Sequence, residues 1–255
     1  MKIVIDFTKS AQDNANDYFS KSKKLKHKSE GAAAMVVELK KQLENIESKP
    51  LQSKKLKRME KREWYERFNW FFTSDGLLVI GGRSAVQNDE INSKYFEDTD
   101  LFFHADIFGA SVMILKNGVS SSKETREEVA QFAGSFSSAW ENLQSSVDVY
   151  SLTREQVTKS RNSGSLSTGS FLLKGEREWY KGVPLKLCAF VENEKIRITP
   201  ELTCQKLVVK HYVSIMVGKS KKSDASKFIS NKLGYENIDY IMQHLPSGTF
   251  SVKEV

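Results

Sequence analysis

The sequence has few residues that lock a fold covalently or locally: two cysteines and four prolines among 255 residues. Cys188 and Cys204 are single residues in apolar, strand-like stretches and do not form a CxxC pair. Their spacing argues against a zinc site or a disulfide framework. We therefore expect two buried, reduced thiols, since cysteine packs as a small hydrophobic residue. A chain of this length buries a sizeable core without such cross-links.

Long apolar runs are also missing. No stretch approaches the roughly 20 residues of a membrane span, and the amino-terminal apolar run ends after three residues at Asp6, unlike a signal peptide. These absences predict a cytoplasmic protein without a membrane partner. The phosphate-loop pattern GxxxxGK[ST], the nucleotide fingerprint GxGxxG and the hydrolase pattern GxSxG are absent too. NTP hydrolysis, dinucleotide redox chemistry and serine-hydrolase chemistry therefore have no support in the sequence.

Positive charge is present and unevenly distributed. Residues 1–62 carry 16 Lys and Arg against 8 Asp and Glu, whereas the remaining residues carry 23 against 24. Residues 206–232 add a second basic stretch, with seven lysines and one acidic residue, Asp224. Local basic segments favour a polyanionic partner, nucleic acid before anionic lipid, because phosphate contacts release counterions. The alternative is a solvated helix face.

The first quarter of the chain predicts a helical hairpin. From Ala11 to Glu47 there is no proline and one glycine, and apolar or small residues recur with the three-four spacing of a coiled coil. Pro50 should end this helix and begin a return helix over residues 51–72. We expect a first domain over residues 1–62, made of a short strand and this basic hairpin. The return arm presents Lys54, Lys55, Lys57 and Arg58.

Residues 63–255 predict a second domain of the α+β class, with a mixed β-sheet and flanking helices. The turn signal at 73–76 separates an aromatic run from a strand. Further elements are expected as helices at 85–96, 123–143, 223–233 and 238–243, and as strands at 101–105, 112–116, 147–152, 169–174, 186–192, 195–199 and 211–217.

The Gly81-Gly82-Arg83 motif follows a strand and precedes a helix whose first turn contains Gln87 and Asn88. Glycines there permit positive φ and close backbone approach, helix amides favour an anion, and Arg83 can form a fork onto phosphate. This arrangement suits an RNA phosphate. A structural turn with Arg83 in a salt bridge is the alternative.

His104 and Asp106 alternate on a strand and should share a face, with Asp100 near its start. An HxD pair could ligate a metal or act as acid and base, which makes a metal-dependent nuclease or hydrolase the rival function. Further ligands do not follow at a recognisable spacing. We therefore favour His104 as a hydrogen-bonded residue of the core or of an RNA-facing surface, beside the turn that ends in Ser111.

Thr168-Gly169-Ser170 places two hydroxyls and a glycine beside a strand, which suits contacts to phosphate or sugar, although a capped turn has the same residues. The aromatic run 64–72 is explained mainly by core packing and docking of the hairpin, with base stacking as the lesser alternative.

The stretches REWYERFNWFFTSDGLLVIGGRSAVQN, DTDLFFHADIFGAS and LSTGSFLLKG, in this order and at these intervals, resemble the NFACT-R domain. That domain belongs to the ribosome quality-control tailing factors, the NEMF and RqcH family, once labelled fibronectin-binding. The start of the chain is similar to the family's coiled coil, and GKSKKSDASKF is similar to the closing helix region. Ser84 stands where the family usually has Asp, and Phe108 where it has His.

The resemblance implies a non-enzymatic RNA- and ribosome-binding module that engages large-subunit RNA and tRNA on stalled complexes, without a cofactor. It covers no counterpart of the NFACT-N domain, so what it implies does not extend to tailing by this polypeptide alone, and a separately encoded NFACT-N subunit is considered as a partner. A coiled-coil scaffold for another protein is the second rival function. The residues expected to face RNA are Arg83, Gln87, Asn88, His104, Asp106, Ser111, Thr168 and Ser170, together with Lys54, Lys55, Lys57 and Arg58 of the hairpin.

Overall fold

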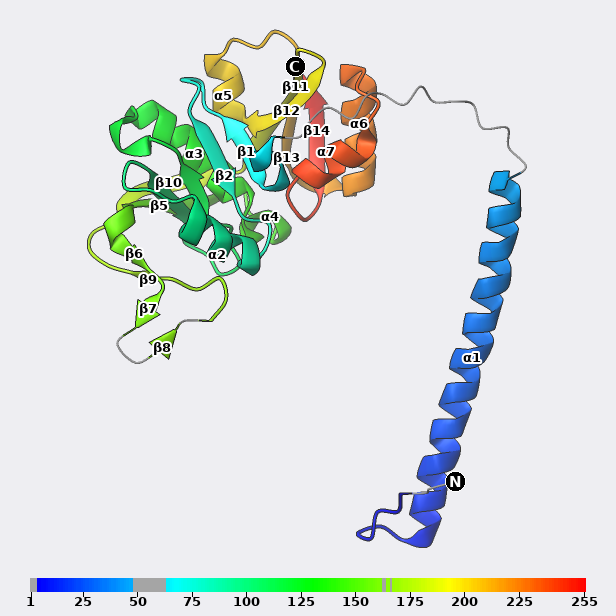
Figure 1. The fold of residues 1–255 in the computed structure, drawn as a ribbon. Helices are drawn as coiled ribbons and strands as arrows, with labels where there is room; N and C mark the ends of the chain where they lie inside the picture. The colour runs from blue at the N-terminus through cyan, green and yellow to red at the C-terminus, as the bar shows by residue number, and fades with distance from the viewer. Residues whose placement is uncertain (1–3, 48–62, 162–163, 166) are drawn as a thin grey trace. The chain divides into compact units, whose positions relative to one another are not determined.

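A computed structural model describes residues 4–47, 63–161, 164–165 and 167–255 (Figure 1). The chain divides into two compact units, residues 1–61 and 62–255, and each is described here by itself. Within the described ranges, no helix is both long and apolar enough to cross a membrane.

The first unit contains one long helix, α1 (Ala11–Glu47), which confirms the predicted helix with the same bounds. The Ser10 hydroxyl accepts a hydrogen bond from the Asp13 amide (3.1 Å), which satisfies one free N–H of the first turn. The short strand expected before it is not formed at residues 4–6. Instead, the Tyr18 hydroxyl donates to the Val4 carbonyl (2.6 Å), so this segment bonds to the helix and has no strand partner.

The return arm of the predicted hairpin lies largely outside the described residues, as do Lys54, Lys55, Lys57 and Arg58. Its last part is described, and there the helix prediction is wrong. A short 3-10 helix, η1 (Trp64–Arg67), leads into strand β1 (Asn69–Phe72). The reason is that Trp70 and Phe71 are both buried but on opposite faces of a sheet, which requires the alternation of a strand.

The second unit is built on two antiparallel sheets, which confirms the α+β class; the sheets are antiparallel, not mixed. Strand neighbours joined by hairpins run antiparallel by necessity, as at the 73–77 turn. The six-stranded sheet has the order β1 (Asn69–Phe72), β2 (Leu78–Gly81), β4 (Met113–Leu115), β3 (Leu101–Ala105), β5 (Ser146–Thr153), β10 (Glu178–Pro184). The four-stranded sheet has the order β12 (Lys195–Pro200), β11 (Lys186–Glu192), β13 (Val213–Ser220), β14 (Phe250–Glu254).

Two short hairpins complete the strands: β6 (Val157–Thr158) pairs with β9 (Leu172–Leu173), and β7 (Ser160–Arg161) pairs with β8 (Gly164–Ser165). The remaining helices are α2 (Ala85–Lys94), η2 (Gly118–Ser120), α3 (Lys123–Ser135), α4 (Ser138–Glu141), η3 (Arg154–Gln156), α5 (Glu201–Lys206), α6 (Lys222–Leu233) and α7 (Ile238–His244). The single helix predicted over 123–143 is divided, because the Ser137 side chain caps a new helix at that point.

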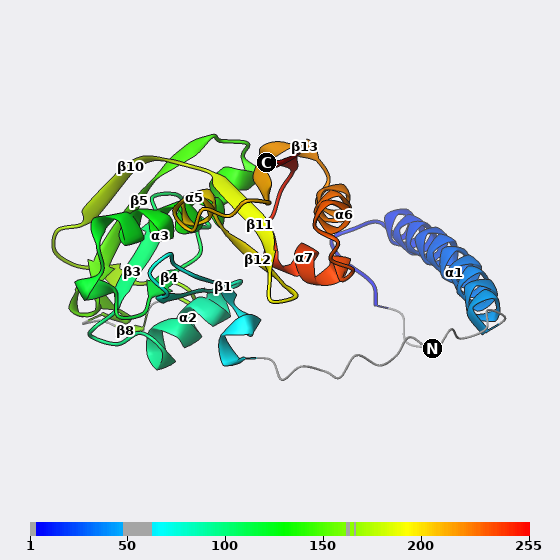
Figure 2. The ribbon, with the colours of Figure 1, turned by 90° about the horizontal axis from the view of Figure 1, so that it is seen from above.

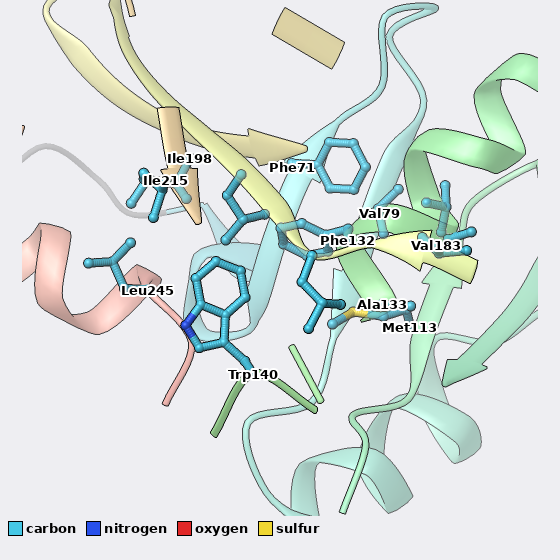
Figure 3. Close-up of a cluster of buried hydrophobic side chains, with 14 of the residues drawn as sticks. Phe71, Val79, Met113, Phe132, Ala133, Trp140, Val183, Ile198, Ile215 and Leu245 are labelled. Atoms are coloured by element: carbon cyan, nitrogen blue, oxygen red, sulfur yellow. The ribbon is translucent and has the colours of Figure 1, made fainter. Parts of the chain in front are cut away.

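The main core lies between the two sheets, and α3 contacts strands of both. Figure 3 shows Phe71 and Val79 of the six-stranded sheet beside Phe132 of α3, with Ile198 and Ile215 of the four-stranded sheet nearby. Figures 1 and 2 place α6 and α7 beside β13 and β14. This core therefore joins both sheets into one packed body.

The opposite face of the six-stranded sheet holds a second core, which α2 covers with Ile91. Alternating residues divide between the cores: Phe103 faces the main one and Phe102 the second. The sheet is therefore buried on both faces along its middle. His104 follows Phe102 on the second face, where this core ends at a groove.

The cysteines correct the sequence prediction, because Cys188 and Cys204 form a disulfide. Cys188 lies on β11 and Cys204 on α5, and the turn from β12 into α5 brings their Cα atoms to 6.6 Å. Both are buried in a small apolar cluster with Phe190. The burial was expected, but the pairing depends on the tertiary path between the residues and has no sequence motif.

Candidate nucleic-acid interface

The three polar motifs of the sequence surround one groove of about 630 Å³. Its floor is the end of the second core, formed by Phe102, His104 and Tyr150 on β3 and β5. Its walls are the turn from β2 to α2 (residues 82–85), the β3–β4 loop (107–111) and the segment 167–171. Segments far apart in sequence therefore meet here, and no Asp or Glu is among the described residues of the lining.

The glycines of the first wall are needed for packing. A Cβ on Gly81 would lie 1.9 Å from the Met113 sulfur, and one on Gly82 would lie 2.0 Å from Asn88 Oδ1. Neither glycine uses the positive φ that glycine permits; what they allow here is the close approach of neighbouring atoms. Positive φ occurs in the other two motifs, at Gly109 (+81°) and Gly169 (+78°). Ser84 begins α2, and its side chain accepts from the Gln87 amide (3.3 Å).

Arg83 is exposed at the groove, and two hydrogen bonds to the protein hold its guanidinium in place. Its Nε donates to Asn69 Oδ1 (3.2 Å), and Nη2 donates to the Phe68 carbonyl (2.8 Å). The salt bridge proposed as its structural alternative is not formed among the described residues; its protein acceptors are neutral. Burial lowers the pKa of Arg83, yet a guanidinium stays charged. An oriented cation with N–H donors to spare is suited to phosphate.

The side chains of Gln87 and Asn88 form hydrogen bonds to backbone groups next to the β2–α2 turn. Gln87 Oε1 accepts from the Arg83 amide (2.9 Å), while its Nε2 donates to the Arg67 carbonyl (3.3 Å). Asn88 is buried in the groove wall, and its Oδ1 accepts from the Val112 amide (3.3 Å). Gln87 thus fixes the backbone at Arg83 and is outside the groove lining, whereas Asn88 joins α2 to Val112 before β4.

His104 lies on the groove floor, with its ring stacked near Phe102 and its Nδ1 3.4 Å from the Tyr150 hydroxyl. Burial lowers its pKa, so the imidazole is neutral at pH 7. Asp106 comes directly after the end of β3, is exposed, and lies 3.9 Å from Arg177 Nη1. The Arg177 guanidinium in turn lies over the Tyr150 ring.

Asp100 is not part of this group. It is fully buried at the other end of β3, where its carboxylate accepts from Lys116 Nζ (2.6 Å) and from the amides of Asn117 and Glu97 (both 2.8 Å). These contacts join the turn before β3 to the turn after β4. Across the ranges that the structure describes, no cluster of three or more His, Cys, Asp or Glu could hold a metal ion.

The other two motifs line the groove with hydroxyl-bearing residues. Ser111 lines the groove, and its amide donates to the Phe136 carbonyl (3.3 Å). Thr168 and Ser170 are exposed on the opposite wall. The Gly169 amide between them donates to Asp89 on α2 (3.0 Å), which ties this wall to the first one.

Residues 67–175 match the family model of the NFACT protein RNA binding domain. The chain contains an NFACT-R domain. It is 36% identical over 219 residues to the archaeal Rqc2 homolog aRqcH of Methanocaldococcus jannaschii, which covers 83% of this chain and 32% of that protein. It is 33% identical to the NEMF homolog of Drosophila melanogaster (69% of this chain, 18% of that protein) and 36% identical to NEMF of Homo sapiens (46% and 11%). The last two are subunits of the ribosome quality control complex. The chain spans a third or less of the length of these relatives.

The NFACT-R match contains every wall of the groove. It also contains two groove residues that sequence reasoning did not select, Phe108 and Tyr150. Tyr150 carries no sequence signal, because its position beside His104 is set by the β3–β5 register. Phe108 could have been selected from the sequence, because it is an aromatic residue between the HAD motif (104–106) and the GAS motif (109–111). Lys222 lies beyond the match and lines, with Arg83, a hollow next to the groove.

Proposed function

We propose that this protein is an RNA- and ribosome-binding module of translational quality control. It contacts large-subunit RNA and tRNA on stalled complexes, mainly through the sugar-phosphate backbone, and works in the cytoplasm without an enzymatic step or a cofactor. The observation that carries the proposal is the convergence of Arg83 and the hydroxyls of Ser111, Thr168 and Ser170 on one groove, whose described lining residues include no carboxylate. The NFACT-R domain and its quality-control relatives support it.

A nuclease or hydrolase based on Asp100, His104 and Asp106 is disfavoured by geometry. Asp100 is committed to Lys116 and to turn amides at the far end of β3, and His104 contacts the Tyr150 hydroxyl. In this proposal Asp100 stabilises the turns that it contacts, and His104 positions the Tyr150 hydroxyl.

Binding should depend on salt and on the groove cations. We expect the affinity for tRNA and for isolated large-subunit RNA to fall linearly on a log–log plot against salt concentration. Arg83→Glu should weaken binding at low salt, whereas Lys123→Glu, at an exposed lysine outside the groove lining, should have little effect. Salt-independent binding, or equal effects of both reversals, would contradict the proposal.

The basic hairpin is a second proposed contact. Reversing Lys54, Lys55, Lys57 and Arg58 together should weaken RNA binding at low salt, and an unchanged affinity would remove the hairpin from the interface. The same preparations can be tested for a separately encoded NFACT-N subunit, by asking whether one co-purifies with the chain after nuclease treatment.

A further inference from the structure

Phe108 is unusual among the residues of the groove. Its side chain is 98% exposed, although it lies in the middle of the NFACT-R domain, on the loop between β3 and β4. It lines the groove on one side and, on the other, an adjoining hollow of about 480 Å³. Burying a phenylalanine is worth about 1.5–3 kcal/mol. The folded protein gains none of this at Phe108, which points to a role outside the stability of the fold.

The backbone that carries Phe108 is held in place. The Ser138 hydroxyl donates to the Phe108 carbonyl (2.6 Å), and the Asp106 amide donates to the Asp148 carbonyl (2.7 Å). Gly109 follows with φ of +81°, a conformation that other residues rarely adopt. The ring is therefore presented from a fixed loop.

The ring lies beside polar and cationic groups, together with the apolar residues Phe136, Leu245 and Pro246 of the hollow. Arg83 lines both the groove and the hollow, and Lys222 lines the hollow, where its Nζ donates to the Leu245 carbonyl (2.8 Å). Arg83 and Lys222 line the same hollow, and burial, with the charge of Arg83, lowers the pKa of Lys222. Ser111 and Ser138 are hydroxyl neighbours in the hollow. One carboxylate, Glu141, lines its rim as well.

We propose that Phe108 stacks against an unpaired RNA base, whose phosphates lie toward Arg83 and Lys222. This inference rests on the proposed RNA-binding function and narrows its ligand to RNA with an unpaired nucleotide. An aromatic ring beside cations and hydroxyls is the arrangement by which proteins bind unpaired nucleotides, since every base offers a π-face. Apolar residues line the hollow as well, so an apolar protein partner is the alternative that the test must distinguish.

The test uses the full chain, a blunt RNA duplex, and the same duplex with an unpaired 3′ overhang carrying 2-aminopurine, whose fluorescence falls on stacking. We expect the wild-type protein to bind the overhang RNA about tenfold more tightly than the blunt duplex and to quench the probe. Phe108→Ala and Phe108→Leu should remove that preference and the quenching, leave blunt-duplex affinity unchanged, and preserve the melting temperature. Phe108→Trp should retain both. Phe7→Ala is the matched control, since Phe7 is 95% exposed in the other unit.

The outcomes separate the inference from the function it rests on. If neither RNA binds at low salt, the proposed function fails and the inference with it. If wild type and Phe108→Ala bind both RNAs equally and with the same salt dependence, RNA binding stands and the stacking role is refuted. An equal loss with Phe7→Ala would also refute it. So would unchanged overhang binding by Phe108→Ala combined with weaker co-sedimentation with large subunits, because the ring would then contact a protein.

Discussion

Replacing Arg83 separates its two tasks, holding the β2–α2 turn and binding RNA phosphate. Arg83→Ala removes the bonds to Asn69 Oδ1 and to the Phe68 carbonyl. At about 1 kcal/mol net for each bond, we expect a loss of about 2 kcal/mol in the free energy of unfolding. For a unit of this size that corresponds to a fall of about 4–8 °C in melting temperature. Arg83→Lys keeps the charge but loses the planar fork, so about half of this loss is expected.

RNA affinity distinguishes the two tasks. Both Arg83 variants should lower tRNA affinity per folded molecule about tenfold, because a bidentate phosphate contact is lost. Asn69→Ala is the matched control, since it removes one acceptor of the guanidinium and leaves the guanidinium itself. It should destabilise the protein by about 1 kcal/mol and lower tRNA affinity much less than Arg83→Ala does. Melting curves and fluorescence-anisotropy titrations measure both quantities. Unchanged affinity in Arg83→Ala, corrected for the folded fraction, would refute the phosphate role.

Three further substitutions, with Gly182→Ala as a control, test the fold of the second unit. Asp100→Asn leaves the Lys116 charge without its buried partner and should cost about 3–5 kcal/mol in urea denaturation, without altering Mn²⁺ binding in isothermal titration. His104 has a lowered pKa, so the unfolded state takes up a proton below about pH 6.5 while the folded state does not, and stability falls as the pH falls. Melting temperatures at pH 7.5 and 5.5 should differ less in His104→Gln than in wild type; an equal difference would count against this assignment. Gly169→Ala should destabilise more than Gly182→Ala in melting experiments, because both have positive φ but only Gly169 has no room for a Cβ.

The elements that the sequence predicted well depend on local rules. The bounds of α1 followed from a run without proline and from apolar spacing, and the strand–turn–helix around Gly82 followed from short-range signals. Features that depend on contacts between residues distant in sequence were predicted less well. The strand at 69–72 was predicted as helix because Trp70 and Phe71 face two cores that the chain assembles only in three dimensions. The disulfide of Cys188 was missed for the same reason.

The candidate site shows the same division. The sequence placed Arg83, Ser111 and Thr168 in motifs that do meet at one groove, because strand ends and turns are recognisable locally. It did not distinguish a side chain that faces the groove from one that supports the turn, as Gln87 does. That distinction depends on hydrogen-bond partners distant in sequence.

The contacts of Glu128 on α3 determine where this protein can be truncated. It is fully buried, and its carboxylate accepts from Ser74 on one side and from Thr203 and Lys206 on the other. It thus joins a turn inside the family match to helix α5, well beyond residue 175 where that match ends. A fragment cut at the edge of the match would lose Thr203, Lys206 and the second sheet. It would also expose the apolar side of α3 to water. The limit of the family match is therefore not a cloning boundary, and the smallest autonomous fragment should extend through β14.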